Sequence, residues 1–162
     1  MTDIAITQLP AAPLHVLEIW SNPVTVLARF EAAFGARLPL LGASLQLSAM
    51  QLIRYEPTVW LAEGDPAGLA EILGADGSLT AIGGGVVRVR LQGSGWRSLL
   101  MEGGVFDAES ADFAAGSSAA TLIDHVNVRL YVESDDACLA YVPLSYARDM
   151  IHFWTVAAKS LV

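Results

Sequence analysis

Apolar and polar positions alternate in two segments of the second half of the chain, which predicts two β-strands. Between residues 86 and 91, valine and leucine alternate with Arg88 and Arg90. Residues 126–132 show the same period of two, with four apolar positions on one face. The acidic pair at 135–136 is typical of a hairpin turn, and an apolar returning strand is expected at 138–142.

Helical spacing is clearest at two places. Asn22 and Pro23 have the residue types of a helix cap and a first helical position, and apolar residues then recur at helical intervals up to Phe34. Gly35 is suited to end this helix in a left-handed conformation. A second apolar stripe follows Ser145, which we expect to cap the last helix.

The remaining segments complete a repeated order of elements. Residues 1–13 are expected to be an extended lead-in, and 103–120 a loop. Further strands are predicted at 14–20, 45–55 and 58–62, and short helices at 65–73 and 96–102. The order strand–helix–strand–strand–helix thus occurs twice, in halves of about 14–77 and 81–162. Neither half is large enough to bury both faces of a sheet alone, so we predict one α+β domain spanning 1–162.

Composition adds an expectation about partners. The 162 residues are 54% hydrophobic and only 16% charged, with a mean hydropathy of +0.48. Charges interrupt every apolar run, so no membrane span is predicted. A small chain with so many apolar residues is expected to cover part of its surface against another polypeptide or a second copy.

Charge and cysteine content narrow the function further. Nine basic residues face seventeen acidic ones, for a net charge of −8, which disfavours nucleic acid as a partner. The N-terminus has neither the basic nor the apolar region of a signal peptide. Cys138 is the single cysteine, so no disulfide within the chain is possible, and we expect a reducing cytoplasm.

Searches for catalytic and metal-binding patterns yield no site. The glycines at 93 and 95 match neither dinucleotide-binding nor phosphate-loop motifs and are interpreted as a tight turn. The three histidines, at 15, 125 and 152, are dispersed. We expect Asp124 and His125 to lie in a strand with side chains on opposite faces, so that they cannot share an ion. We therefore predict no catalytic and no metal-binding residue.

Two further groups of side chains have residue types that can act in catalysis. Cys138 lies in an apolar strand and is expected to behave as a small core residue. Three carboxylates share the loop at 103–120, namely Asp107, Glu109 and Asp112. Nothing in the surrounding sequence would desolvate them, so we interpret them as solvated or as helix caps.

One polar surface remains as a candidate binding site. Arg88 and Arg90 share the polar face of one strand, and His125 and Arg129 are assigned to the polar face of another. If both strands belong to one sheet, the guanidinium groups could hold a carboxylate-bearing ligand or an acidic partner. The alternative is a solvated face whose arginines pair with neighbouring acidic residues.

Several short strings of the second half, taken together, resemble a known family. They are Gly93 with Leu99-Leu100, Phe106-Asp107, Phe113-x-x-Gly116-x-x-Ala119-x-Thr121, and Ser145-Tyr146-Ala147. In this order and spacing they resemble the gamma subunit of heterotetrameric sarcosine oxidase, over the part of the chain from Thr58 to Trp154. The family commonly has an arginine where this chain has Leu144, and an aspartate and a serine in the segment where it has 81–85.

The resemblance implies a fold and a role. The fold would be that of folate-binding aminomethyltransferases, relatives of the glycine-cleavage T-protein, which is built from duplicated halves. The role would be that of a small subunit without catalysis of its own, packed against the large subunit of an oxidoreductase complex of one-carbon metabolism. Flavin, NAD and zinc would then belong to the partner subunits.

Two alternatives stay open. The chain could be a stand-alone folate-binding protein, a degenerate aminomethyltransferase whose arginine-bearing face, with Arg88, Arg90 and Arg129, holds the glutamate tail of tetrahydrofolate. It could also be a homo-oligomeric scaffold. The sequence leaves open the substrate, the partner and the oligomeric state.

Overall fold

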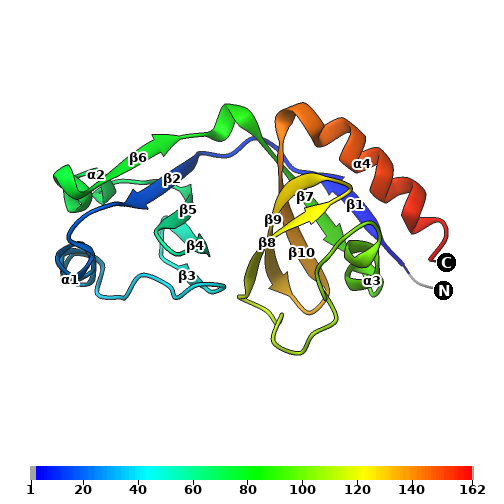
Figure 1. Ribbon diagram of the computed structural model, residues 1–162, viewed down its shortest axis with the longest axis horizontal. Coiled ribbons are helices and arrows are strands. Elements are labelled where there is room, and N and C mark those ends of the chain that lie inside the picture. The colour runs from blue at the N-terminus through cyan, green and yellow to red at the C-terminus, as the bar shows by residue number, and fades with distance from the viewer. Residues whose placement is uncertain (1–2, 162) are drawn as a thin grey trace. The chain divides into compact units, whose positions relative to one another are not determined.

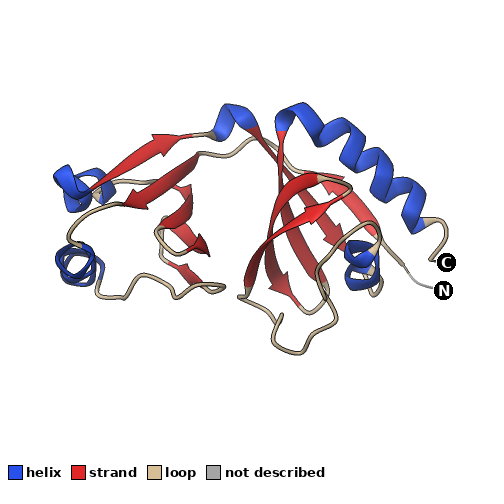
Figure 2. Ribbon diagram, viewed as in Figure 1, coloured by secondary structure: helices blue, strands red, loops and turns tan. Residues whose placement is uncertain are grey.

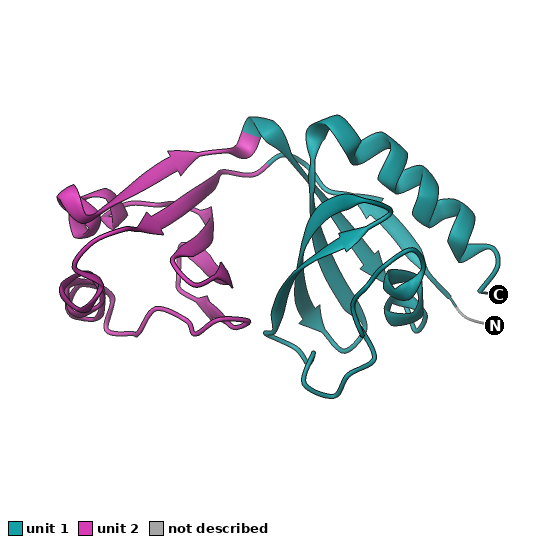
Figure 3. Cartoon of the chain, in the orientation of Figure 1, with its two compact units in different colours: residues 1–11, 84–162 teal, residues 12–83 magenta. Residues whose placement is uncertain are grey.

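The computed structural model describes residues 3–161, which form two compact units. Unit 2 comprises residues 12–83, and unit 1 combines the segment before residue 12 with the chain from residue 84 onward (Figure 3). Each unit contains one antiparallel five-stranded sheet and two α-helices (Figures 1 and 2). The predicted α+β fold class is therefore confirmed.

Unit 2 is built from a continuous segment. In chain order its elements are β2 (Leu14–Ile19), α1 (Pro23–Phe34), β3 (Ser44–Gln46), β4 (Met50–Glu56), β5 (Val59–Gly64), α2 (Leu69–Leu73), the 3-10 turn η1 (Gly74–Asp76) and β6 (Gly77–Ala81). The strands lie in the order β3-β4-β5-β2-β6, and every neighbouring pair is antiparallel.

Unit 1 takes its first strand from the N-terminal end of the chain. Its elements are β1 (Ala5–Gln8), β7 (Val86–Gln92), α3 (Trp96–Met101), β8 (Ser118–Ile123), β9 (Val126–Ser134), β10 (Ala137–Pro143) and α4 (Leu144–Ala158), and the 3-10 turn η2 (Gly83–Gly85) precedes β7. The strand order is β8-β9-β10-β7-β1, again antiparallel throughout.

The two sheets have the same plan. β7, α3, β8, β9, β10 and α4 follow one another as β2, α1, β3, β4, β5 and α2 do, and the strands occupy matching places. The edge strand beside β2 or β7 differs in origin. In unit 2, β6 follows α2 and η1 along the chain, whereas in unit 1 the matching strand, β1, comes from the N-terminal segment that precedes unit 2. The predicted duplication is present, and the structure adds two strands to each sheet, β3 and β6 in unit 2 and β1 and β8 in unit 1.

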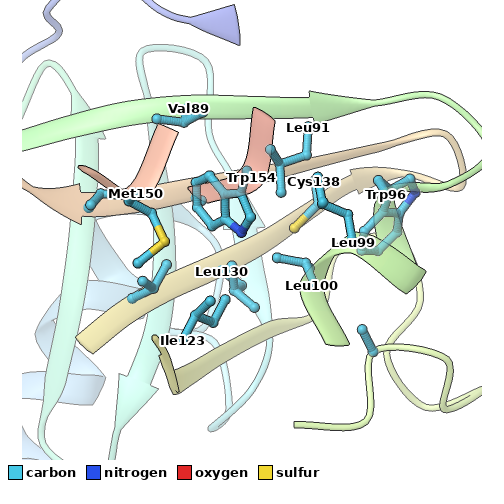
Figure 4. Close-up of a cluster of buried hydrophobic side chains, with 14 of the residues drawn as sticks. Val89, Leu91, Trp96, Leu99, Leu100, Ile123, Leu130, Cys138, Met150 and Trp154 are labelled. Atoms are coloured by element: carbon cyan, nitrogen blue, oxygen red, sulfur yellow. The ribbon is translucent and has the colours of Figure 1, made fainter. Parts of the chain in front are cut away.

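The core of unit 1 follows from the alternation along its strands. The apolar face of the sheet packs against α3 and α4, and the buried residues include Val89, Leu91, Leu130, Trp96 and Trp154 (Figure 4). Unit 2 has an equivalent core, in which one face of the sheet packs against α1 and α2. In both units the period-two face of a sheet meets the apolar stripe of a helix, which is how each element removes its apolar side from water.

The helix starts differ from the predictions in detail. Asn22 and Pro23 do begin α1, but the Asn22 side chain makes no capping bond and donates instead to Asp76 Oδ1, at 2.8 Å. Gly35 ends α1 with a φ of 66°, as predicted. The expectation that Ser145 caps the last helix is wrong, because α4 begins at Leu144 and follows Pro143 directly.

Four further differences concern strands. Residues 45–55 form a hairpin, β3 and β4, rather than one strand. Gly77 begins β6, a strand that the sequence pattern did not predict, and a side chain at this position would collide with the Glu18 carbonyl of the adjacent strand. The extended lead-in contains β1, and the small residues from Ser118 onward, assigned to a loop, begin β8.

Asp124 and His125 do not lie in a strand. Both have positive φ, at 45° and 65°, and together they form the two-residue turn between β8 and β9. Such turns match the twist of a hairpin, and aspartate and histidine tolerate the left-handed conformation better than most residues. The prediction that they belong to a strand is therefore wrong.

Candidate functional site

The arginine-bearing face lies on the sheet of unit 1, opposite the face that packs on the helices. Arg88 and Arg90 are on β7, Arg129 is on β9, and β10 lies between these strands. Tyr141 of β10 pairs with both Arg88 and Arg129, so these three residues form one row across the sheet. Two strand spacings, about 10 Å, separate the backbones of Arg88 and Arg129.

Arg90 is held by a carboxylate of the same unit. Its Nε and one terminal nitrogen lie 2.6 and 2.8 Å from the two carboxylate oxygens of Glu133, a two-bond geometry that fixes both side chains. Arg88 donates to the carbonyl oxygen of Pro10, at 2.6 Å, and so fastens the segment that follows β1 to β7. Both guanidinium groups therefore have structural partners within the unit.

His125 is separate from this row. It is exposed in the turn that precedes β9, so it does not belong to the alternating face of that strand. The structure thus brings Arg88 and Arg129 into one row, places Arg90 beside it in a pair with Glu133, and leaves His125 at the hairpin tip. Glu133 was missed by the sequence analysis, although its alternation with Arg129 and Tyr131 along the strand was a usable signal.

The residues considered for metal binding and for nucleophilic catalysis do not form a site of either kind within residues 3–161. Among residues 3–161, no group of three or more His, Cys, Asp and Glu side chains is placed to share a metal ion. Burial raises the pKa of the Cys138 thiol to about 12, and the residue lies within the core of unit 1. The thiol is therefore protonated at neutral pH and is a poor nucleophile.

The loop between α3 and β8 is held in place by residues within and beside it. Asp107 Oδ1 accepts the backbone N–H of Glu109, and the Glu109 carboxylate accepts the Ser98 hydroxyl. Arg97 of α3 donates to two loop carbonyls, those of Ala108 and Phe113, at 2.6 and 2.9 Å. Asp107 thus caps a local turn and Glu109 links the loop to α3, whereas the contribution of Arg97 was not predicted from the sequence.

Aromatic packing completes this loop. Phe113 contacts Phe106 and Trp96 edge to face, with ring centroids 4.7 and 6.2 Å apart. Gly116 has a φ of 87°, and its N–H donates to Val132 of β9. Phe106, Asp107, Phe113 and Gly116 belong to the strings that carry the family resemblance, and each of them here shapes the loop.

The structure also explains why a glycine stands at position 93. Its φ is 114°, and a side chain at this position would collide with the carbonyl of Asp3 in the segment that leads into β1. Glycine therefore allows the N-terminal segment to pass close to the end of β7. This agrees with the interpretation of residues 93–95 as a tight turn.

Both units expose large apolar side chains. Trp20, Val24 and Leu27 lie at the end of β2 and along the first turns of α1, and Val24 is 79% exposed. Unit 1 exposes Val105 in its loop, at 82%, and Leu144, Tyr146 and Val156 on α4. None of the described helices is long and apolar enough to cross a membrane.

Comparisons with known proteins establish the fold. No family matches the sequence, and no curated protein matches it either. Among solved structures, the chain is similar to a chain of the heterotetrameric sarcosine oxidase from Corynebacterium sp. U-96, solved with pyrrole 2-carboxylate. The TM-score is 0.85 at 18% identity, over 97% of this chain and 84% of that one.

The fold is also similar to that of the glycine cleavage system aminomethyltransferase T from Bartonella henselae. Here the TM-score is 0.64 at 17% identity, over 94% of this chain. The chain covers only 45% of that aminomethyltransferase. The fold is thus similar to those of a sarcosine oxidase chain and an aminomethyltransferase, as the resemblance implied.

Proposed function

We propose that this chain is a gamma-type subunit of a heterotetrameric sarcosine-oxidase-like flavoenzyme, and that it carries no catalysis of its own. The observation that carries the proposal is the extent of the structural similarity. It spans nearly all of this chain and 84% of a sarcosine oxidase chain, but under half of an aminomethyltransferase. The greater coverage of the oxidase chain supports an oxidase-type subunit rather than an aminomethyltransferase.

The role of the resemblance residues supports the same proposal. Phe113, Gly116 and Gly93 shape a loop and admit the N-terminal segment, so the likeness to the gamma subunit rests on residues that maintain the fold. Arg90 is neutralised by Glu133 rather than left facing a ligand. In this proposal the cofactors flavin, NAD and zinc are held by partner subunits, and the assembly works in the cytoplasm.

Exposed apolar side chains supply surfaces for the large subunit. Val24 lies on α1, Val105 in the loop between α3 and β8, and Val156 near the end of α4, and each is at least half exposed. Removing such side chains from water is the main favourable contribution to association. The proposal expects at least one of these surfaces to be covered by the large subunit in the complex.

Co-expression with the large flavin-containing subunits of the same organism tests the proposal. The tagged chain should co-purify with them in fixed proportion, and at least one of Val24→Asp, Val105→Asp and Val156→Asp should abolish co-purification without changing the fold. Thr25→Asp, at an exposed polar position of α1, is the matched control. Failure of the unmodified chain to bind, or binding that survives all three substitutions, would contradict the proposal.

A folate-binding role is the second candidate, favoured by the similarity to an aminomethyltransferase. The row of Arg88, Tyr141 and Arg129 would then meet the glutamate tail of tetrahydrofolate. Calorimetric titration with tetrahydrofolate decides between the candidates. Heat that disappears in Arg129→Ala supports this role, and no heat at about 1 mM ligand eliminates it.

A further inference from the structure

β1 is attached to the rest of unit 1 by noncovalent contacts. The chain leaves unit 1 after residue 11, forms the whole of unit 2, and returns to unit 1 at residue 84. In the sheet, β1 lies at the edge and pairs with β7. The matching strand β6 differs, because it continues directly from α2 and η1 of its own unit. The position of β1 therefore depends on its contacts with the remainder of unit 1.

The backbone ladder between β1 and β7 is short. The N–H of Leu9 donates to the carbonyl of Arg88 at 2.9 Å. Bonded pairs alternate along an antiparallel ladder. The bonded pairs that follow are Thr7 with Arg90 and Ala5 with Gln92. Release of β1 would thus leave the backbone groups of Arg90 and Gln92 without a partner strand.

On its other side, β7 pairs with β10. The N–H of Gly93 donates to the carbonyl of Asp136 at 3.0 Å, just beyond the end of this ladder. By the same alternation, Val89 and Leu91 bond to β10. Neighbouring residues of β7 therefore report on different strands, the even-numbered ones on β1 and the odd-numbered ones on β10.

Two contacts fasten the ends of the segment that contains β1. After β1, the guanidinium group of Arg88 donates to the Pro10 carbonyl at 2.6 Å. Before β1, the N–H of Gly95 donates to the Asp3 carbonyl at 3.4 Å, and this same carbonyl passes close to Gly93. Residues 3–10 are thus held at both ends by β7 and by the turn that follows it.

The segment contributes little buried apolar surface. Three of the four residues of β1 are exposed, and Ile4 and Ile6 are only partly buried where they pack on the core of unit 1. By contrast, Val89 and Leu91 of the neighbouring strand are fully buried. Exposed backbone hydrogen bonds and few buried apolar contacts are features of segments that open at a low cost in free energy.

From this geometry we propose that residues 3–10 form a strap, which closes the edge of β7 and opens as one unit while the remainder of unit 1 stays folded. Opening uncovers the backbone groups of Arg90 and Gln92 and the part of the core on which Ile4 and Ile6 pack. An uncovered strand edge can accept another extended segment, so the strap controls access to this edge. The proposal concerns the chain by itself and does not rest on the function proposed above.

Amide hydrogen exchange of the full chain, measured by NMR, tests the proposal. The strap amides are those of the two bonded pairs, Ala5, Thr7, Arg90 and Gln92. Val89 and Leu91 are the internal control, because they lie on the same strand but bond to β10. The four strap amides should share one protection factor, lower than that of the control amides by roughly tenfold or more.

A core substitution outside the strap separates local opening from unfolding of the unit. Val128 of β9 is 1% exposed and lies three places from β1 in the strand order. Val128→Ala weakens the core equally whether the strap is closed or open. It should therefore lower the protection of Val89 and Leu91 by about tenfold or more and leave that of the strap amides unchanged.

A substitution within the strap should act differently. Ile6→Ala removes an apolar contact that only the closed strap makes, so the protection of the strap amides should fall by about tenfold. The control amides should fall by the same factor, because the contact is also lost when the unit unfolds. Thr7→Ala, at an exposed position of the same strand, is the matched control and should change neither group appreciably.

Three results would overturn the proposal. Strap amides that follow Val89 and Leu91 in every variant would mean that β1 separates only when the unit unfolds. Protection of Arg90 and Gln92 that differs from that of Ala5 would mean that the segment does not move as one unit. Strap amides without measurable protection would mean that the strap is not closed over β7 in solution.

Discussion

Units 1 and 2 build the same five-stranded plan from differently proportioned parts. In unit 2 the longer helix comes first, with twelve residues in α1 and five in α2. In unit 1 the order is reversed, with six residues in α3 and fifteen in α4. Each sheet still buries one face against its two helices. The comparison teaches that strand order and the helix-facing side of the sheet define this fold, whereas helix length can be redistributed between the two crossover positions.

The second difference between the units is the origin of the edge strand, which pairs with β2 in unit 2 and with β7 in unit 1. Unit 2 supplies β6 from its own continuous segment, whereas unit 1 takes β1 from the start of the chain. Unit 1 must therefore admit an N-terminal segment past Gly93, and it fastens that segment through Arg88 and Pro10. The four predictions that follow test this correspondence, from the largest expected effect to the smallest.

Truncation of matching core residues should have the largest effect. Leu17 of β2 and Leu91 of β7 occupy corresponding strands, and each is 1% exposed or less. Leu17→Ala and Leu91→Ala should each lower the free energy of unfolding by about 2–5 kcal/mol, because each leaves a cavity in a packed core. Urea denaturation measures both. A loss well below this range at one position would show that the two strands do not have equivalent places in their cores.

Gly93→Ala should lower the free energy of unfolding by about 1–3 kcal/mol, since the positive φ and the collision with Asp3 both oppose a side chain. Gly35→Ala is the matched control in unit 2, because Gly35 also has a positive φ but open space around it. Removal of residues 1–9 should reduce the effect of Gly93→Ala toward that of Gly35→Ala. An unchanged effect would mean that the N-terminal segment does not require this glycine.

Two buried tryptophans allow a comparison of hydrogen bonding. Trp60 of unit 2 donates its indole N–H to Pro39 at 3.2 Å, whereas the indole N–H of Trp154 in unit 1 has no partner among the described residues. Substitution by phenylalanine removes similar volume at both sites, so Trp60→Phe should cost about 1 kcal/mol more than Trp154→Phe. Thermal or urea unfolding compares them. Equal losses would indicate that the Trp154 N–H is also satisfied, for instance by water.

Asp76 should make the smallest contribution, and one that depends on pH. Hydrogen bonds from Asn22 and Ser21, together with the nearby Arg29, hold the pKa of Asp76 below its ordinary value of 3.8. A lowered pKa in the folded state stabilises the protein above the ordinary value, and this stabilisation is lost as the pH falls through the folded value. Asp76→Asn should therefore destabilise at pH 7 and have progressively less effect as the pH falls below 3.8.

Stability measurements from pH 2 to 7 would show this, with Asp149→Asn on the exposed face of α4 as the control for the loss of one charge. The same difference at every pH would mean that the carboxylate charge of Asp76 is not what stabilises the start of α1.

Much of the fold could be predicted because its signals are local. The alternation at 86–91 and 126–132 located β7 and β9 and separated their core face from their polar face. Asn22, Pro23 and Gly35 bounded α1 because caps and left-handed ends depend on backbone conformation at single residues. The strands that were missed lack such signals. β1, β3, β6 and β8 are short segments of small or mixed residues, and they become strands because each pairs with the edge of a neighbouring strand.

The candidate site was predictable only in part. The alternation placed Arg88, Arg90 and Arg129 on polar strand faces, and the structure puts these faces on one sheet. His125 was misplaced because the turn at Asp124 and His125 lacks the glycine that usually marks it. Alternation along the strand could have placed Glu133 on the polar face, but its pairing with Arg90 joins residues far apart in the sequence and depends on which strands meet.

The sequence alone therefore determined the class of fold, its duplication and the direction in which each regular strand faces, because these properties depend on the period of apolar residues along a few turns of chain. Tertiary structure alone decided that β1 pairs with β7, which lies some eighty residues later in the sequence. It also decided that the Asp3 carbonyl passes close to Gly93, and that Glu133 neutralises Arg90. Those outcomes depend on which distant segments meet, and that is set by the packing of the whole unit rather than by any stretch of its sequence.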